Sequence, residues 1–341
     1  MKTFKRKFRF MIFMWIPLLL ISCKNEEKSN LSHQMEMKEI EMEEKLVVEK
    51  VALPAFGNLV EVKTTGMNFI LPDEIPSGWT TFRYSNESPL THFMLIDKLP
   101  VVKGKQITYD DFENIPPVFR DAMDLINAGK TDEGFSEFSR LPEWFSEVIF
   151  SGGVGLVSPG ETAQTTVYVK PGTYVIECYV KTGGVFHPMT RQLEVKKDQS
   201  YETPPTPTLN MAISREGGIE MPESPTAGLH TIAVEFKDQG PHEHFLGHDV
   251  HLVRLKKDTD LDELNSWMTW TRPEGLNTPA PVKFLGGVQE MPAGNTAYFT
   301  VDLQPGNYAW ISEVPNPKEK NMLKTFSVSD DEIGSISGER D

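Results

Sequence analysis

Residues 171–178 read Pro171-Gly172-Thr173-Tyr174-Val175-Ile176-Glu177-Cys178, and residues 305–312 read Pro305-Gly306-Asn307-Tyr308-Ala309-Trp310-Ile311-Ser312. Both stretches begin with a Pro-Gly turn, place a tyrosine two residues later and continue with β-branched or aromatic residues. Such residues favour a half-buried β-strand. The match indicates one structural unit that occurs twice, with a serine in the second copy where the first has a cysteine.

The repeat extends beyond these two turns. From Gly152 to Cys178, the second copy follows at a constant offset of 134 residues, and an ungapped match of that length indicates a duplication. The glycine pair that opens this stretch, in Gly152-Gly153-Val154-Gly155, is repeated in Gly286-Gly287-Val288-Gln289. We therefore expect the pair to form a turn or bulge that the fold needs, and not a phosphate-binding loop.

Short runs rich in Val, Ile, Phe, Tyr and Thr alternate with turn residues, which is typical of antiparallel sheets. Between residues 108 and 150, apolar residues recur at helical spacing, which predicts a helical insertion on one edge of a sandwich. We predict an all-β fold with small helical insertions. Its expected parts are a first domain at 51–200, a Pro-rich linker at 201–208, a second domain at 209–330 and a flexible tail at 331–341.

The chain opens with a basic cluster, followed by an apolar run from Phe10 to Leu20 and by Leu20-Ile21-Ser22-Cys23. This order is typical of a secretory signal, and the apolar run is too short to span a bilayer. The last four residues resemble the bacterial lipobox. The resemblance implies a signal peptide at 1–22, a lipid anchor on Cys23 and an acidic tether at 23–50. An ordinary cleaved signal that happens to contain Cys23 is the alternative.

Lys24-Asn25-Glu26-Glu27 resembles the acidic export signal of surface lipoproteins of Bacteroidota-type bacteria, which implies the outer membrane and its outer face. Residues 1–22 contain five bases and no acid, so removing them takes the formal net charge from −15 to −20. A chain this acidic is not expected to bind nucleic acid. With Cys23 lipidated, Cys178 has no partner for a disulfide within the chain.

The hairpin at 171–195, which carries Cys178, His187 and Met189, is similar to the closing hairpin of cupredoxin-like domains. In particular it resembles a group of uncharacterised bacterial lipoproteins built from such domains. The resemblance covers most of 60–197 and, with weaker ligands, 209–330. It implies a Greek-key β-sandwich for each copy. It also implies copper as the candidate cofactor, with a site at one pole of the first sandwich made by His92, Cys178, His187 and Met189.

A structural role for these residues is the alternative. Met189 follows His187 by only two residues, where copper-binding relatives usually leave a wider gap, and eight residues form a long loop between Cys178 and His187. A free cysteine is commonly a small buried apolar residue. In that case His187 and Met189 would be ordinary loop and core residues.

The second copy cannot form this copper site, because Ser312 replaces the cysteine. It carries a secondary histidine cluster instead, and imidazole is a common ligand for zinc, nickel and copper. A hydrophilic loop that is rich in histidine and binds metal weakly is the alternative that we favour. The cluster consists of His242, His244, His248 and His251.

No Gly-x-Ser-x-Gly or His-Glu-x-x-His motif occurs in the chain, so we assign no catalytic residue. We expect a non-enzymatic cell-envelope lipoprotein whose tandem β-sandwiches bind an unknown protein or small-molecule ligand. The alternative is a copper-binding, electron-transfer or copper-handling protein with a type-1-like site in the first domain. A copper oxidoreductase with ligands from both copies is the third and least expected function.

Overall fold

The computed structural model describes residues 52–198, 203–242 and 247–329. The predicted signal peptide, Cys23, the tether, the C-terminal tail and His244 lie outside the described residues, as do positions 201 and 202 of the linker. The described residues from Leu53 onward belong to one compact unit. Within the described ranges, no helix combines the length and the apolar character needed to cross a membrane.

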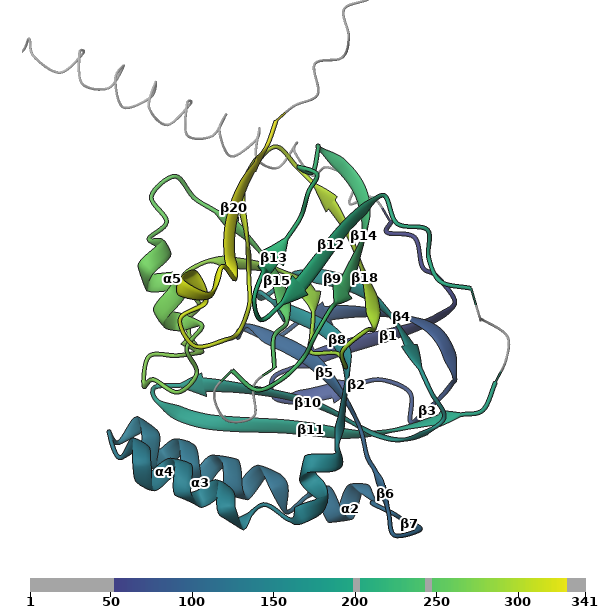
Figure 1. Cartoon of the computed structure of the whole chain (residues 1–341), viewed down its shortest axis with the longest axis vertical. Helices are drawn as coiled ribbons and strands as arrows, with labels where there is room; N and C mark the ends of the chain where they lie inside the picture. Colours follow the sequence, from purple (N-terminus) through teal and green to yellow (C-terminus); the bar gives the residue numbers. More distant parts are fainter. Residues whose placement is uncertain (1–51, 199–202, 243–246, 330–341) are drawn as a thin grey trace, which may run out of the picture. The chain divides into compact units, whose positions relative to one another are not determined.

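The first repeat is a sandwich of two β-layers (Figure 1). In β1, buried and exposed residues alternate, with Val60 and Val62 facing the interior and Glu61 and Lys63 facing outward. This period of two directs one apolar side of each layer towards the other. One layer runs in the order β2 (Asn68–Ile70), β1 (Asn58–Thr65), β4 (Gly78–Asn86) and β9 (Thr162–Val169). The other runs in the order β8 (Ile149–Val157), β5 (His92–Lys98), β10 (Gly172–Thr182), β11 (Val185–Lys196) and β3 (Glu74–Pro76).

The described part of the second repeat has the same strand order, apart from the edge strand β3. One layer runs β13 (Gly218–Glu220), β12 (Leu209–Ser214), β14 (Gly228–Phe236) and β18 (Thr296–Leu303). The other runs β17 (Lys283–Val288), β15 (Val250–Leu255), β19 (Gly306–Ile311) and β20 (Leu323–Val328). Three further elements are the helix α5 (Leu261–Trp267), the 3₁₀ turn η3 (Pro317–Lys320) and the short strand β16 (Asn277–Thr278). Strand β16 pairs with β10 of the first repeat. The predicted fold class, an all-β fold of two β-sandwich repeats with few helices, is confirmed.

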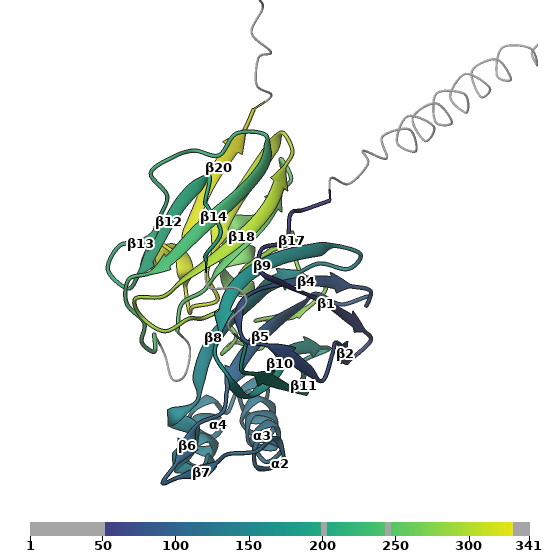
Figure 2. The ribbon, with the colours of Figure 1, turned by 90° about the vertical axis from the view of Figure 1, so that its right-hand side faces the viewer.

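The two repeats are joined through both layers (Figure 2). Strand β9 pairs with β18 and β8 pairs with β17, so an eight-stranded and a ten-stranded sheet run through both repeats. At these junctions, residues that are 134 positions apart pair with each other: Thr165 with Phe299, and Val154 with Val288. Antiparallel pairing of equivalent residues is what a two-fold axis produces. The repeats are therefore related by a pseudo-two-fold axis through the junction.

The glycine pair forms a bulge in each repeat, as predicted. Gly153 has φ +140° and Gly287 has φ +143°. Next to each of them the pairing register shifts, with one extra residue on the strand that carries the glycine. A Cβ atom at Gly153 would lie 1.9 Å from the carbonyl oxygen of Met94. At Gly287 it would lie 2.0 Å from the carbonyl oxygen of Val250. Only glycine fits this backbone.

A helical segment follows the small hairpin β6 (Val101–Val102) and β7 (Lys105–Gln106). Helix α2 begins at a capping box formed by Thr108 and Asp111, and Pro116 and Pro117 lie in the first turn of α3. The buried side of α3 packs along β11, so the segment covers a face of the ten-stranded sheet (Figure 1). The expectation that it lies on one edge is therefore wrong, because an apolar helix face needs an apolar surface to cover. Its elements are α2 (Tyr109–Phe112), α3 (Ile115–Asn127), α4 (Thr131–Glu137) and the 3₁₀ turns η1 (Phe138–Arg140) and η2 (Glu143–Glu147).

Candidate functional site

The closing hairpin of the first repeat differs from the expected one. Strand β10 continues past Cys178 to Thr182, and β11 begins at Val185. Gly183 and Gly184 have φ values of +58° and +81° and form a two-residue turn, which suits the twist of a hairpin. The expectation of a long loop after Cys178 is therefore wrong, since those residues are strand and tight turn.

The interior side of this hairpin brings His92 and Cys178 together. Both side chains are buried, and His92 Nδ1 lies 3.3 Å from Cys178 Sγ. The backbone N–H of Phe93 also donates to this sulfur at 3.4 Å. Burial raises the pKa of the Cys178 thiol and lowers the pKa of His92 to about 4. At neutral pH the contact therefore joins a thiol and a neutral imidazole.

The other two candidate copper ligands lie on β11. Met189 is opposite Cys178 in the strand ladder, and His187 is opposite Val180. His187 Nε2 lies 2.8 Å from the hydroxyl of Thr182, with which it shares a hydrogen bond. Among the described residues, no group of three His, Cys, Asp or Glu side chains with converging ligand atoms includes His92, Cys178 or His187. Of the expected ligand atoms, His92 Nδ1 and Cys178 Sγ lie close together, whereas the imidazole of His187 is hydrogen-bonded to Thr182. The four-residue copper site therefore stays a prediction.

The secondary histidine cluster is divided. His242 Nε2 lies 3.1 Å from His248 Nδ1, and the other ring nitrogen of His248 is 2.9 Å from the carbonyl oxygen of Asp238. Burial lowers the pKa of His242 to about 4 and also lowers the pKa of His248. His251 belongs to a different group, because its Nδ1 accepts from the backbone N–H of Leu156 and its Nε2 lies beside Asp249.

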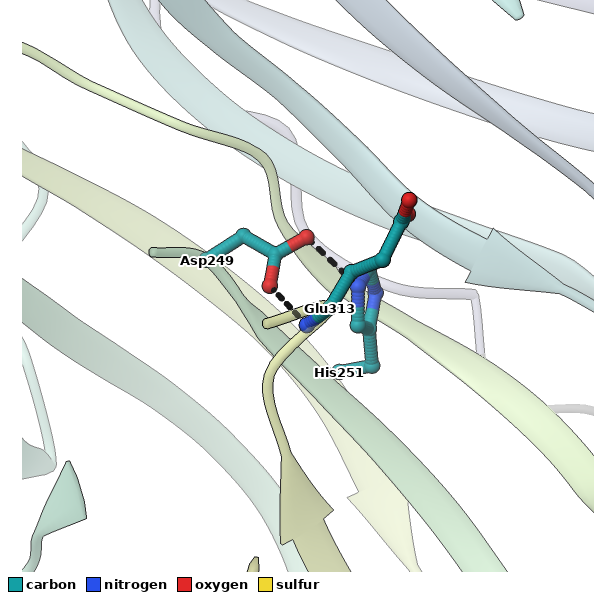
Figure 3. A group of neighbouring side chains, drawn as sticks. All are labelled: Asp249, His251 and Glu313. Atoms are coloured by element: carbon teal, nitrogen blue, oxygen red, sulfur yellow. Dashed lines mark hydrogen bonds and ion pairs between the residues drawn. The ribbon is translucent and has the colours of Figure 1, made fainter. Parts of the chain in front are cut away.

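Sequence reasoning missed that group, which comprises Asp249, His251 and Glu313 (Figure 3). Asp249 Oδ1 accepts hydrogen bonds from the Ser312 hydroxyl at 2.8 Å and from the Glu313 backbone N–H at 2.6 Å. Glu313 Oε1 accepts a hydrogen bond from the Tyr179 hydroxyl at 2.9 Å. Tyr179 and Glu313 are equivalent residues, 134 positions apart, so the group lies at the junction of the two repeats.

The ligand atoms of this group lie within 4.8 Å of one another, which invites a metal ion. The protonation of His251 opposes this assignment. The backbone N–H of Leu156 donates to His251 Nδ1 at 3.0 Å, so the proton of the neutral ring is on Nε2. Nε2 lies 2.6 Å from Asp249 Oδ2, although too far off line for a well-formed hydrogen bond. A metal ligand needs a free lone pair, and the group is therefore an Asp–His dyad.

Further carboxyl groups, buried at Asp97, Glu290 and Glu313 and half-buried at Glu177, continue from this dyad across the junction. Burial raises the pKa of Glu177 to about 7. Burial and the nearby charge of Glu177 raise the pKa of Asp97 well above its usual range, and the two carboxyls are hydrogen-bonded. Burial and the nearby charge of Asp249 also raise the pKa values of Glu290 and Glu313 well above their usual range. One sequence signal was available: Asp97 and Glu177 are acidic residues within apolar strands.

A cavity of about 70 Å³ lies between the ten-stranded sheet and the helical segment. Glu177 and Tyr179 enter it from β10, and Glu290 enters it from the segment after β17 of the second repeat. An open groove of about 530 Å³ adjoins the cavity and shares Phe145, Phe150 and Glu290 with it. The apolar lining of the cavity includes Leu95, Ile115, Pro116, Phe119, Phe145, Phe150, Phe186 and Pro188.

No known protein family and no curated protein matches this chain. Among solved structures, it is similar to auracyanin from Roseiflexus castenholzii, with 18% identity over 41% of this chain and 98% of that chain, and a TM-score of 0.24. A copper-containing nitrite reductase from Thermus scotoductus matches at 13% identity over 80% of this chain and 61% of that chain, with a TM-score of 0.20. A multicopper oxidase matches at 10% identity over 80% of this chain and 88% of that chain, with a TM-score of 0.21. Because these TM-scores are low, we infer no chemistry from these proteins.

Proposed function

We propose that this chain is a non-enzymatic, lipid-anchored protein of the cell envelope that binds a small ligand between its helical segment and the sheet shared by both repeats. The lipobox resemblance at Cys23 and the acidic residues that follow support anchoring to the outer membrane, with the folded part exposed at the cell surface. The physiological partner or ligand is a small molecule of the cell's surroundings.

The observation that carries the proposal is the cavity with its adjoining groove. An apolar pocket with a few converging polar groups is the usual form of a small-molecule site. A water molecule occupies roughly 10–15 Å³ on this measure, so about 70 Å³ accommodates a group of several heavy atoms. Both repeats supply carboxyl groups to it, through Glu177 and Glu290, and burying such groups costs free energy in the absence of a partner. A ligand that pairs with them offsets this cost.

The Asp249–His251 dyad supports a binding role over a hydrolytic one. In a catalytic triad, the histidine accepts the proton of the nucleophile and the aspartate orients the histidine. Here the Ser312 hydroxyl donates to Asp249 Oδ1 instead. The carboxylate therefore lies between the hydroxyl and the imidazole, and His251 has no hydroxyl to activate in this arrangement.

Blocking the cavity should abolish ligand binding. Thr190 lines the cavity, and we expect Thr190→Trp to fill it, whereas Gln192→Trp on the same strand is exposed and serves as the control. With 1-butanol as a neutral probe, saturation-transfer NMR of the full chain should show binding to the wild type and to the control, and at least about a fivefold loss in Thr190→Trp. Thermal denaturation of each variant checks the fold. Unchanged binding in a folded Thr190→Trp protein would place the probe elsewhere and contradict the proposal.

Copper binding is the second candidate, and the contact between His92 and Cys178 favours it. If copper binds, these two residues would hold it, and the metal would supply electron transfer. The observed set does not close around a metal, because His187 is bonded to Thr182.

We therefore expect a Cu(II) titration of the full chain to give no intense visible band. A thiolate copper site requires converging imidazoles, and among the described residues Cys178 has only the His92 imidazole beside it, so any weak binding should be unchanged by Cys178→Ser. The same weak binding should be reduced when His242 and His244 are both replaced by Ala. Visible absorption and electron paramagnetic resonance provide the measurement. An intense band that disappears in Cys178→Ser would make copper handling the first candidate.

A further inference from the structure

We infer that the cavity selects a small organic cation, of the alkylammonium class, whose charged end lies between the carboxyl groups of Glu177 and Glu290. This inference rests on the proposed ligand-binding function and adds the chemical class of the ligand. The alkyl part of the ligand would lie along the aromatic walls and extend towards the groove.

The electrostatic surroundings of the cavity are strongly acidic. Glu177 and Glu290 line it. The carboxyl of Asp249 acts electrostatically on Glu290 and on Glu313, and Asp97 lies close enough to interact electrostatically with both Glu177 and Glu290. The nearby cation is Lys181, whose Nζ donates to the carbonyl oxygens of Trp270 at 2.7 Å and of Arg272 at 2.8 Å. Lys181 is thus held away from the cavity, and the local potential favours a cation and disfavours an anion.

The hydrogen-bonding groups of the cavity are mainly acceptors. The Tyr179 hydroxyl donates to Glu313, and the Thr190 hydroxyl shares a hydrogen bond with Tyr109 at 2.9 Å. The carboxyl oxygens of Glu177 and Glu290 add acceptor capacity beyond the hydrogen bonds that they accept from Asp97 and from the backbone of Gly247. At pH 8 the Glu177 carboxyl, whose pKa is about 7, is mostly ionised, and an ionised carboxylate accepts hydrogen bonds but cannot donate them. A cation bound beside Glu290 favours the ionised form of that carboxyl as well, so the complementary group carries N–H donors and a positive charge.

The walls suit the apolar part of such a ligand. Tyr179 and Phe186 form a ring pair on the sheet side, with centroids 5.5 Å apart, and Phe119 and Phe145 form a pair on the helix side, with centroids 5.9 Å apart. Aromatic rings attract organic cations through their quadrupoles. A hydrated divalent ion fits less well, because such ions require about six or more oxygen ligands and these walls are apolar.

The test compares three probes of similar size on the full chain at pH 8: n-butylammonium, 1-butanol and butyrate. We expect n-butylammonium to bind about tenfold more tightly than 1-butanol and butyrate to show no binding, by saturation-transfer NMR with competition. In Glu177→Gln and in Glu290→Gln, this preference should fall to about twofold, because each variant removes one carboxyl that can ionise beside the bound cation. Glu194→Gln, which changes a carboxyl outside the cavity on β11, should leave it unchanged.

The outcomes separate the inference from the function on which it rests. Equal affinity for n-butylammonium and 1-butanol, with both blocked by Thr190→Trp, would overturn the cation preference and keep the ligand site. Tighter binding of butyrate would overturn it as well. Absence of binding by all three probes would overturn both proposals. A preference for n-butylammonium that persists in folded Glu177→Gln and Glu290→Gln proteins would show that these carboxyls do not recognise the charge.

Discussion

Replacing Gly153 with alanine is expected to lower the free energy of unfolding by about 3–5 kcal/mol. Two effects act together at this position. Its φ of +140° is a conformation that residues with a side chain rarely adopt. The added Cβ atom would also lie 1.9 Å from the carbonyl oxygen of Met94 on the paired strand, so the two strands would have to separate at the bulge. Urea denaturation followed by circular dichroism measures the loss.

The chain offers a matched control for the steric part of this effect. Gly160 also has a positive φ, +76°, but a Cβ atom there would have no neighbour within 4 Å. We expect Gly160→Ala to cost only about 1 kcal/mol, which is the conformational cost alone. Gly287→Ala should behave like Gly153→Ala, because its Cβ would lie 2.0 Å from the Val250 carbonyl oxygen. If Gly153→Ala costs no more than Gly160→Ala, the bulge does not explain why both repeats have the glycine pair.

The fold could be predicted because its determinants are local and occur twice. The tyrosine of each Pro-Gly-x-Tyr turn makes the same hydrogen bond: Tyr174 donates to the carbonyl oxygen of Lys170 at 2.8 Å, and Tyr308 donates to that of Gln304 at 2.6 Å. Because this contact joins residues only four apart, it can be recognised from a short sequence motif, Pro-Gly-x-Tyr. The alternation of apolar residues in the strands is equally local.

The candidate site could not be predicted in the same way, because it depends on how the repeats pair. The hydrogen bond between Tyr179 and Glu313 forms because β8 pairs with β17 and β9 pairs with β18, which brings the two repeats together. The register between two sheet edges is not encoded in the period of either strand. Asp97 and Glu177 did leave a signal as acidic residues within apolar strands, but their partner Glu290 comes from the other repeat.

One local feature was also missed. The dipeptide Gly183-Gly184 between two apolar runs is a strong signal for a two-residue hairpin turn. The resemblance to copper-binding hairpins favours a long loop at the same place, and this expectation conflicts with the turn signal. The turn extends β10 and β11 by several residues beyond Cys178. The extension places His187 opposite Val180, where it pairs with Thr182.

The pH dependence of stability provides the second large effect. Burial raises the pKa of Glu177 from 4.5 to about 7. Below pH 4.5, this carboxyl is protonated in both the folded and the unfolded chain, and its contribution to stability is fully present. Between pH 4.5 and 7, the unfolded chain releases the proton while the folded chain keeps it, so stability falls as pH rises. Above pH 7 the loss is complete and amounts to about 3 kcal/mol.

We therefore expect Glu177→Gln to raise the free energy of unfolding by up to about 3 kcal/mol at pH 8 and to leave it nearly unchanged at pH 4. The amide is uncharged at both pH values, and its oxygen can still accept the hydrogen bond from Asp97. Urea denaturation of the full chain at the two pH values gives the difference, with Glu194→Gln as a surface control that should change stability by less than about 0.5 kcal/mol.

Comparing the variant with the wild type at each pH cancels the opposing effect of the buried imidazole of His92. Its pKa, lowered to about 4, makes the fold less stable as pH falls below 6.5. A cation held between Glu177 and Glu290 would reduce the cost of ionising Glu177, so n-butylammonium at saturation should shrink the gain from Glu177→Gln at pH 8. If Glu177→Gln destabilises the chain at pH 8 as much as at pH 4, the ionised carboxyl is already compensated within the fold, and the acidic cavity has no need of a cationic ligand.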